Sequence, residues 1–196
     1  MEFILTGTFE IDGGVVTASE AKTDYQVQLV AAPPAFSAGT WTVTDSSNVL
    51  LVTRTPATQT DYYTVPIIMP FRTTADKGAK LKSVTVVATL GGTISTTNDD
   101  FEINIVQVTT PADGSAPVGS VLAGDAAADY EAAYGTKAER LVAGTHTFVV
   151  TIPTLEQDFI DSGEQLYCRV KVVDAGSADL TCVLKGFIAA FDVNTL

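Results

Sequence analysis

The stretch Leu166-Tyr167-Cys168-Arg169-Val170-Lys171-Val172 carries apolar residues at its even positions and mainly polar residues at its odd positions. A period of two is typical of a β-strand that buries one face and exposes the other to water. Phe101-Glu102-Ile103-Asn104-Ile105 repeats the pattern, with the apolar residues at odd positions. Both stretches therefore predict strands of antiparallel sheets that cover a core with one face.

The rest of the chain has the same texture. Short runs rich in Val, Ile, Thr and aromatic residues are separated by Gly, Pro, Asp, Asn and Ser, as expected for strands joined by turns. We predict an all-β fold, namely an antiparallel, jelly-roll-like β-sandwich with one short helix in a long connection between strands. Further strands are expected near residues 3–11, 25–30, 40–43, 49–53, 62–68, 81–90, 146–152 and 180–193.

One segment, Asp125–Tyr134, departs from the strand pattern. It is rich in Ala, carries acidic residues in its first turn and is followed by Gly135, all of which favour a helix. Because so short a helix is unstable alone, we expect it on the surface or across a sheet edge, in the connection between residues 109 and 145. Tyr130 and Tyr134 would share one face of it.

A polar, Thr-rich segment at residues 53–61 is typical of a linker or long loop. We divide the chain there into an N-terminal β-rich arm or small sheet, residues 1–60, and a jelly-roll-like β-sandwich, residues 61–196. The first part is poor in core aromatics, so we expect it to pack against the second part or against a neighbouring molecule. It is the candidate attachment segment.

The last two strands are predicted to form a hairpin around a three-residue loop, Asp174-Ala175-Gly176. In this register every inward residue faces another inward residue, whereas a shift by one would oppose apolar to polar side chains. The outward pairs are Lys171 with Asp179 and Arg169 with Thr181. The inward pairs are Val170 with Leu180, Cys168 with Cys182 and Leu166 with Leu184.

Composition limits the partners. The chain has 196 residues, with 11 Lys+Arg and 23 Asp+Glu, and a formal net charge of −12. We expect no nucleic-acid partner, because phosphate binding requires clustered Lys and Arg. We expect no membrane partner, because the charge-free stretch at residues 25–44 is interrupted by Gln and Pro. The N-terminus lacks a basic leader and a long apolar core, so cytoplasmic synthesis is the default.

The predicted redox state of the two cysteines depends on this expected place of synthesis. The predicted hairpin places Cys168 opposite Cys182, close enough for a disulfide. Without a secretory leader, two buried thiols are the preferred interpretation, and the disulfide stays open as the alternative. A zinc site is not expected, because His146 is the single histidine.

No catalytic, cofactor-binding or metal-binding residue is predicted, and the chain is expected not to be an enzyme. His146 shares its parity with Phe148 and Val150, so we interpret it as a structural histidine at the margin of the inward face. The nucleophile motif Gly-x-Ser-x-Gly is absent. The carboxylates lack the spacing of a glycosidase pair or a calcium loop, and the cluster at residues 156–164 is interpreted as a solvated loop, with calcium the best remaining option. They are Asp99, Asp100, Asp125, Asp129, Glu156, Asp158, Asp161 and Glu164.

Exposed aromatic rings would provide a platform for sugar binding. The competing interpretation is that these rings belong to the core or to an interface, and we expect Trp41 to be packed. The candidates are Trp41, Tyr62, Tyr63, Tyr130 and Tyr134.

From Tyr62 onward the order of elements is similar to a known class. Thr64-Val-Pro-Ile-Ile-Met-Pro-Phe-Arg72 precedes Gly78-Ala-Lys-Leu-Lys-Ser-Val-Thr-Val-Val87, and a strand ending Ile105-Val-Gln-Val-Thr109 precedes a long insert. The chain closes with Thr145-His-Thr-Phe-Val-Val-Thr-Ile-Pro153, Gly163-Glu-Gln-Leu-Tyr-Cys-Arg-Val-Lys-Val172 and Gly186-Phe-Ile-Ala-Ala-Phe-Asp192. This order resembles the jelly-roll-like β-sandwich virion proteins of tailed bacteriophages, which serve in capsid decoration, head fibres and tail attachment.

The resemblance implies a non-enzymatic structural protein of the virion, assembled in the host cytoplasm. It implies a homo-oligomer that attaches to a phage capsid or tail, with the major capsid protein or other virion proteins as partners and residues 1–60 as the anchor. No functional residue transfers from it. The alternative is a carbohydrate-binding or receptor-binding β-sandwich module with a host-surface glycan as partner, and fold alone does not separate the two.

Overall fold

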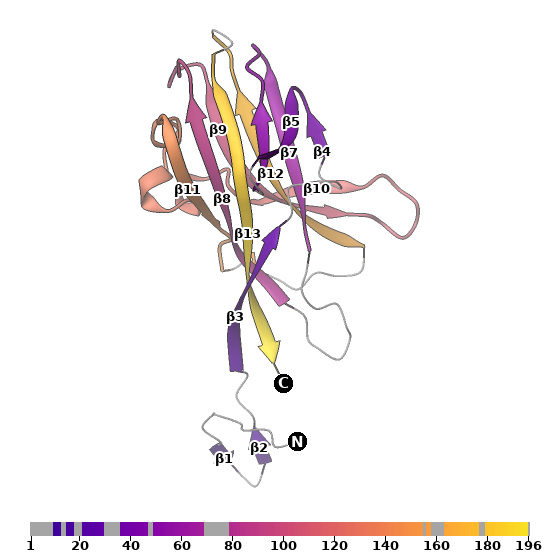
Figure 1. The fold of residues 1–196 in the computed structure, drawn as a ribbon. Coiled ribbons are helices and arrows are strands. Elements are labelled where there is room, and N and C mark those ends of the chain that lie inside the picture. Colours follow the sequence, from indigo (N-terminus) through magenta and orange to yellow (C-terminus); the bar gives the residue numbers. More distant parts are fainter. Residues whose placement is uncertain are drawn as a thin grey trace.

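The computed structural model describes residues 10–12, 15–17, 21–29, 36–46, 49–68, 79–154, 156–157, 163–176 and 179–195. These residues form two antiparallel sheets packed face to face, so the predicted all-β sandwich is confirmed (Figure 1). The strands are β1 (Glu10–Asp12), β2 (Val15–Thr17), β3 (Ala21–Leu29), β4 (Phe36–Ala38), β5 (Trp41–Ser46), β6 (Val49–Arg54), β7 (Thr60–Ile67), β8 (Ala79–Gly91), β9 (Asp100–Thr109), β10 (Val118–Ala123), β11 (Gly144–Thr151), β12 (Glu164–Val173) and β13 (Thr181–Thr195). The helices are η1 (Ala127–Asp129), η2 (Ala132–Tyr134) and α1 (Lys137–Arg140).

Among the described residues, the five-stranded sheet has the order β10-β9-β12-β7-β4. The six-stranded sheet has the order β11-β8-β13-β6-β5, and β3 pairs with the C-terminal part of β13 where β6 has ended. In Figure 1, β3 lies beside this end of β13, below the sandwich. β1 and β2 form a separate small antiparallel pair.

From β6 to β13, consecutive strands lie in opposite sheets, with the hairpin β9–β10 as the exception. This alternation is typical of a jelly roll, the kind of sandwich that the sequence predicted, although no alternation of consecutive strands was predicted. Its consequence is that most connections cross from one sheet to the other at an end of the sandwich.

The predicted hairpin of the last two strands is wrong. β12 pairs with β7 and β9, whereas β13 pairs with β3, β6 and β8 in the other sheet. The connection at residues 174–180 crosses between the sheets, so Val170 lies opposite Tyr63 and Ile103 instead of Leu180. The predicted faces are nevertheless correct, since Leu166, Cys168, Val170, Leu180, Cys182 and Leu184 are all buried. Apolar alternation fixes the face of a strand and leaves its partner open.

Of the described strands that precede residue 60, β3 to β6 belong to the same two sheets as the rest, whereas β1 and β2 pair with each other. β4 pairs with β7, and β6 pairs with β13. Residues 55–59 are a short connection between β6 and β7. The role of residues 1–60 as an attachment segment stays a prediction, and most of the strand expected near residues 3–11 lies outside the described residues.

The helix predicted at Asp125–Tyr134 is replaced by the two short 3-10 helices η1 and η2, and the α-helix α1 begins only at Lys137. The Asp129 side chain accepts hydrogen bonds from the backbone N–H of Gly124 (2.8 Å) and Ala126 (3.2 Å), which favours a turn over a continuous helix. Tyr130 forms an isolated bridge with Val150 of β11. The segment therefore lies across a sheet edge, as expected.

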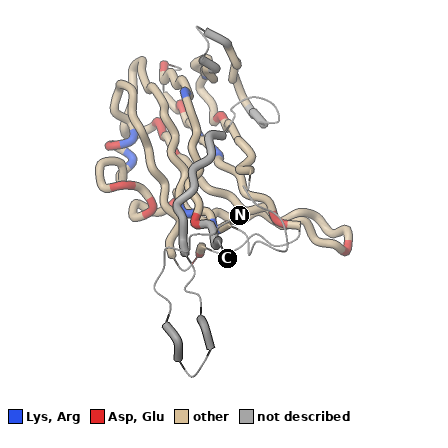
Figure 2. Tube along the Cα trace, turned by 60° about the horizontal axis from the view of Figure 1, so that its bottom comes forward, with Lys and Arg blue, Asp and Glu red and all other residues tan. Residues whose placement is uncertain are grey.

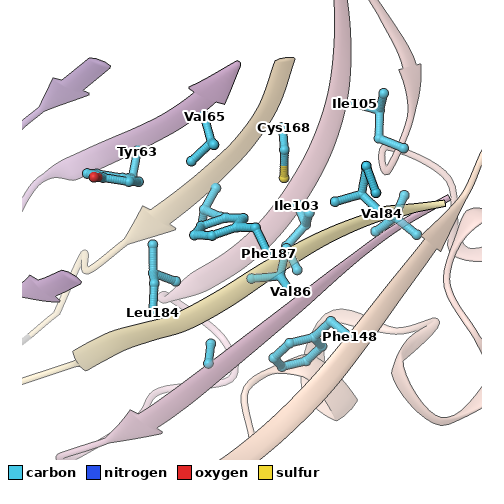
Figure 3. Close-up of a cluster of buried hydrophobic side chains, with 14 of the residues drawn as sticks. Tyr63, Val65, Val84, Val86, Ile103, Ile105, Phe148, Cys168, Leu184 and Phe187 are labelled. Carbon is cyan, nitrogen blue, oxygen red and sulfur yellow. The ribbon is translucent and has the colours of Figure 1, made fainter. Parts of the chain in front are cut away.

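The core fills the space between the two sheets (Figure 3). Val65, Ile103 and Cys168 approach it from the five-stranded sheet, and Val86 and Phe187 from the six-stranded sheet. Burying each such side chain stabilises the fold by about 1.5–3 kcal/mol. The largest apolar contributions come from fully buried rings and branched chains, namely Phe101, Phe148, Phe187, Phe191, Leu81, Leu90, Ile103 and Ile105.

One end of the sandwich holds a buried polar network centred on Arg54, whose side chain is fully buried. Its Nε donates to Asp61 Oδ2 (2.5 Å), and its Nη1 donates to the backbone oxygen of Leu180 (2.7 Å) and to Asp174 Oδ2 (3.4 Å). Its Nη2 donates to the backbone oxygen of Ala57 (2.7 Å). We call Arg54, Asp61 and Asp174 the buried charge network, and it joins β6 to β7 and to the β12–β13 connection.

Neighbouring groups complete this network. Gln59 Nε2 donates to Asp61 Oδ1 (2.6 Å), and the backbone N–H of Leu180 donates to Asp174 Oδ2 (3.2 Å). Gly39 has a φ of 104° and lies so close to the Asp61 carboxylate that a Cβ there would collide with it. Gly39 therefore allows the turn before β5 to close over the network.

We predict that Val170→Asp destabilises the protein by about 3–5 kcal/mol, because it places an unpaired charge in the core. Val170 is fully buried, whereas its neighbour Lys171 is half-buried on the outer face. Lys171→Ala should change the free energy of unfolding by about 1 kcal/mol or less. Urea denaturation measures both. A harmless Val170→Asp beside a severe Lys171→Ala would reverse the assigned faces.

We also predict that Arg54→Met destabilises the protein by about 3–5 kcal/mol, since it leaves the Asp61 and Asp174 carboxylates buried without their cation. Lys185→Met removes an exposed cation and is the matched control, with an expected effect of about 0.5 kcal/mol or less. The measurement is again the free energy of unfolding in urea. Equal stability of the two variants would show that the network contributes nothing.

Candidate functional site

Polar and aromatic side chains gather on the outer face of the five-stranded sheet, on the side of each strand opposite to the core. The register places Arg169 of β12 beside Asn104 of β9, and Lys171 beside Glu102 and Tyr62. Alternation along β7, β9 and β12 places these side chains on the outer face while their chain neighbours are buried, although Asn104 is itself buried, with 3% of its surface exposed. We call this surface the polar face, and its members are Tyr62, Asp100, Glu102, Asn104, Tyr167, Arg169 and Lys171.

Arg169 lies at the centre of the polar face. Its Nη2 donates to Asn104 Oδ1 (3.3 Å), and its guanidinium carbon is 5.5 Å from the centroid of the Tyr62 ring. Arg169 Nε is buried and has no hydrogen-bond partner. Because a guanidinium carries five N–H donors, this side chain keeps donors that the protein leaves unused.

Beside it, Lys171 balances two carboxylates. Lys171 Nζ is 3.1 Å from Glu102 Oε2 and 3.9 Å from Asp100 Oδ2. Partial burial raises the pKa of Glu102, a hydrogen bond with Asp100 raises it further, and Lys171 opposes the rise. The polar face therefore presents acceptors and donors side by side.

Tyr167 adds a second ring to the polar face. It is half-buried, its hydroxyl donates to Gln165 Oε1, and it lies opposite Val106 and Pro66. Rings on a face with mixed donors and acceptors suit a polyhydroxylated ligand, whose C–H surfaces pack on rings while its hydroxyls both donate and accept.

The five aromatic residues proposed from the sequence do not form one platform. Tyr62 lies on the polar face, but Trp41 and Tyr63 pack together inside, with ring centroids 5.4 Å apart. Tyr130 is buried, and its hydroxyl accepts from the backbone N–H of Ile103 (2.8 Å). Tyr134 packs on Phe148, with centroids 4.6 Å apart. The expected packing of Trp41 is confirmed.

Tyr167, Arg169 and Asn104 were not proposed as site residues from the sequence. The signal for them was present in the sequence. The alternation of residues 166–172 places Tyr167 and Arg169 outward, and that of residues 101–105 places Asn104 opposite to the apolar positions. The sequence does not show which strands are neighbours in the sheet, and only that pairing brings these three side chains together.

His146 is half-buried at the margin of the inward face, as predicted. Its Nε2 is 2.9 Å from the backbone oxygen of Val142, and its Nδ1 is 3.3 Å from the Tyr134 hydroxyl. The ring contacts those of Tyr134 and Phe148, with its centroid 5.7 Å from each. Both ring nitrogens thus have protein partners, which is the arrangement of a structural histidine.

Several carboxylates stabilise turns. Asp99 is buried and accepts from the backbone N–H of Ser95 (2.7 Å) and of Ala175 (3.2 Å). Asp158 and Asp161 lie outside the described residues. Within the described part of the chain, no three His, Cys, Asp or Glu side chains gather in a way that could hold a metal ion. In the same part, no helix combines the length and the apolar composition needed to cross a membrane.

Comparison with solved structures finds other β-sandwiches. The xylan-binding module CBM15 is 12% identical with a TM-score of 0.46, over 86% of this chain and 97% of the module. The winged bean acidic lectin is 9% identical with a TM-score of 0.45, over 89% of this chain and 100% of the lectin. A chain of infectious bursal disease virus, Gt strain, is 14% identical with a TM-score of 0.33, over 94% of this chain and 37% of the viral chain.

No protein-family model and no curated protein sequence matches this chain. With TM-scores below 0.5, these structures carry no argument about this chain. The strand pairing confirms the sandwich part of the resemblance to virion proteins, and the bacteriophage part stays a prediction.

We predict that Cys168 and Cys182 do not react with a thiol reagent at pH 8 while the protein is folded. Both are free and fully buried, and burial raises the pKa of each thiol to about 12, which removes the reactive thiolate. In denaturant both should react at once. Absorbance after addition of Ellman's reagent measures this, and rapid reaction of the native protein would contradict the described burial.

Proposed function

We propose that this chain is a non-enzymatic β-sandwich binding module and that its polar face binds carbohydrate. The observation that carries the proposal is Arg169, whose guanidinium lies over Tyr62, donates to Asn104 and retains unused donors on an outer sheet face. The buried Nε of Arg169 is shielded from solvent and so is not itself a ligand contact; the terminal N–H groups of the guanidinium are the donors that a sugar hydroxyl would reach.

The chemistry of the polar face fits a neutral glycan. Arg169 and Lys171 offer charged donors, Asp100 and Glu102 offer charged acceptors, and these two pairs of opposite charges balance within the face. Hydrogen bonds from sugar hydroxyls to charged groups are each stabilising by about 1.5–3 kcal/mol. Tyr62 and Tyr167 supply ring surface. Contacts among these side chains hold them in place before a ligand arrives, which lowers the entropic cost of binding.

We predict that Arg169→Met weakens the binding of a neutral glycan at least tenfold, because it removes a charge-assisted donor worth more than about 1.4 kcal/mol. Tyr167→Ala should weaken it similarly through loss of ring contact. Isothermal titration with soluble xylan, β-glucan and galactan measures the affinities.

The matched controls lie on the outer face of the opposite sheet. Lys185→Met and Thr147→Ala change exposed residues there and should leave the affinity unchanged. Failure of the unmodified protein to bind any neutral glycan, or equal affinities of Arg169→Met and Lys185→Met, would contradict the proposal.

A structural role in a virion is the second candidate. The observation that favours it is the outer face of the six-stranded sheet, which is poor in acidic side chains although the chain carries a net charge of −12. Among its described side chains the one carboxylate is Asp192, which is 3.2 Å from Lys82 Nζ. The remaining surface is flat and rich in β-branched residues, namely Thr85, Val87, Thr89, Thr147, Val149, Val183 and Ile188.

Such a face, with Lys80, Lys82 and Lys185 but few carboxylates, suits docking on an acidic surface of a capsid or tail, and the acidic remainder would keep bound copies apart. In this candidate role the chain is a homo-oligomer of the virion, assembled in the host cytoplasm with other virion proteins. Electron microscopy of intact particles labelled with an antibody against this chain tests the role, and particles without label would exclude it.

A further inference from the structure

Each sheet of the sandwich ends in strands with an unpaired edge, and such edges invite pairing with another chain unless they are protected. The edge strands of the described sheets are β10 and β4 on one sheet and β11, β5 and β3 on the other, where β3 pairs only with β13. All of them except β10 show a protecting feature, and β3 includes the charged residues Lys22 and Asp24. β11 is covered by Tyr130, which bridges to Val150, and by Glu131, whose N–H donates to Val149 (3.3 Å). β4 is only three residues long, and β5 contains Asp45.

β10 is different. Its six residues, Val118–Ala123, include no charge and no proline. Val118 is 65% exposed and Val121 is 38% exposed, so the strand is open to solvent on both faces. The β9–β10 hairpin extends beyond the body of the sandwich in both views, which leaves its outer edge free to be approached (Figures 1 and 2).

One face of this hairpin is apolar. Val121 lies opposite Val106, and Gly119 lies opposite Val108, so these four residues share a face. A Cβ at Gly119 would be 3.9 Å from a methyl group of Val106 and 3.9 Å from one of Val108, in ordinary contact. Gly119 therefore leaves a shallow space beside two valine side chains.

We propose that β10 pairs antiparallel with β10 of a second copy of this chain, joining their five-stranded sheets edge to edge. A two-fold axis perpendicular to the sheet relates two such strands, and residues that face each other across it then lie on the same side of the sheet. When Ser120 faces Ser120 of the second copy, Val121 of each chain faces Gly119 of the other. Each Val121 thus fills the space that Gly119 leaves.

The absence of charged residues from β10 also suits pairing with a second copy. Two chains of net charge −12 repel each other, and the repulsion falls with distance and with salt. An uncharged strand on a projecting hairpin lets two copies pair while the rest of each acidic molecule stays remote. A dimer formed in this way should become more stable as the salt concentration rises.

The test uses a single reactive cysteine. In Ser120→Cys the new thiols face each other across the two-fold axis, whereas Cys168 and Cys182 are buried and unreactive. Mild oxidation of the folded protein should give a covalent dimer on a non-reducing gel. Ser115→Cys, an exposed position in the turn of the same hairpin, is the matched control and should cross-link much less.

A second variant tests the same interface without covalent cross-linking. Val121→Lys places a charge at the edge and should yield a monomer in sedimentation equilibrium, with an unchanged circular dichroism spectrum. Three outcomes would overturn the proposal: an unmodified protein that is monomeric at all concentrations and salts, equal cross-linking of Ser120→Cys and Ser115→Cys, or an oligomer that Val121→Lys leaves intact.

Discussion

The sandwich depends on one interaction that its apolar core does not supply, the contact of Arg54 with Asp61 and Asp174. Arg54 ends β6 in one sheet, Asp61 lies in β7 of the other, and Asp174 follows β12. Apolar packing between two sheets lacks direction, whereas charged hydrogen bonds at fixed distances specify which connections meet. A buried ion pair adds little net stability over an apolar substitute, so we expect its role here to be to fix the arrangement of the β6–β7 and β12–β13 crossings at one end of the molecule.

This arrangement also positions the polar face. Because β6 crosses to β7, and because the chain after β12 crosses to β13, β12 lies between β7 and β9 instead of pairing with its successor. Arg169 therefore lies between Tyr62 and Asn104, from strands that are distant in sequence. The same sheet ends at β10, so the proposed glycan-binding residues and the proposed pairing edge are parts of one layer. Pairing of two copies through β10 would place two polar faces on the same side of a continuous sheet.

The fold class and the faces of individual strands could be predicted from the sequence, because alternation depends only on neighbouring residues. Val170 and Cys168 were correctly assigned inward in this way. Strand partners could not be predicted, since two inward faces match equally well in one sheet or across the core, and the predicted hairpin failed for that reason. The prediction of a helix at residues 125–134 was wrong because it rested on helix propensity alone. The hydrogen bonds of the Asp129 side chain and the bridge between Tyr130 and Val150 favour another conformation. To predict the polar face, one must know which strands are neighbours as well as which side of each strand points outward. Of its two rings, only Tyr62 was therefore proposed from the sequence.

The place of the last strands in the sheets has a consequence for biosynthesis. β12 lies between two strands of one sheet, and β13 lies between β8 and β6 of the other, yet both come from the final part of the chain. Neither sheet is continuous until residues 164–195 have left the ribosome. During translation the earlier strands therefore lack their central partners. Because these contacts join residues that are distant in sequence, we expect the protein to fold slowly.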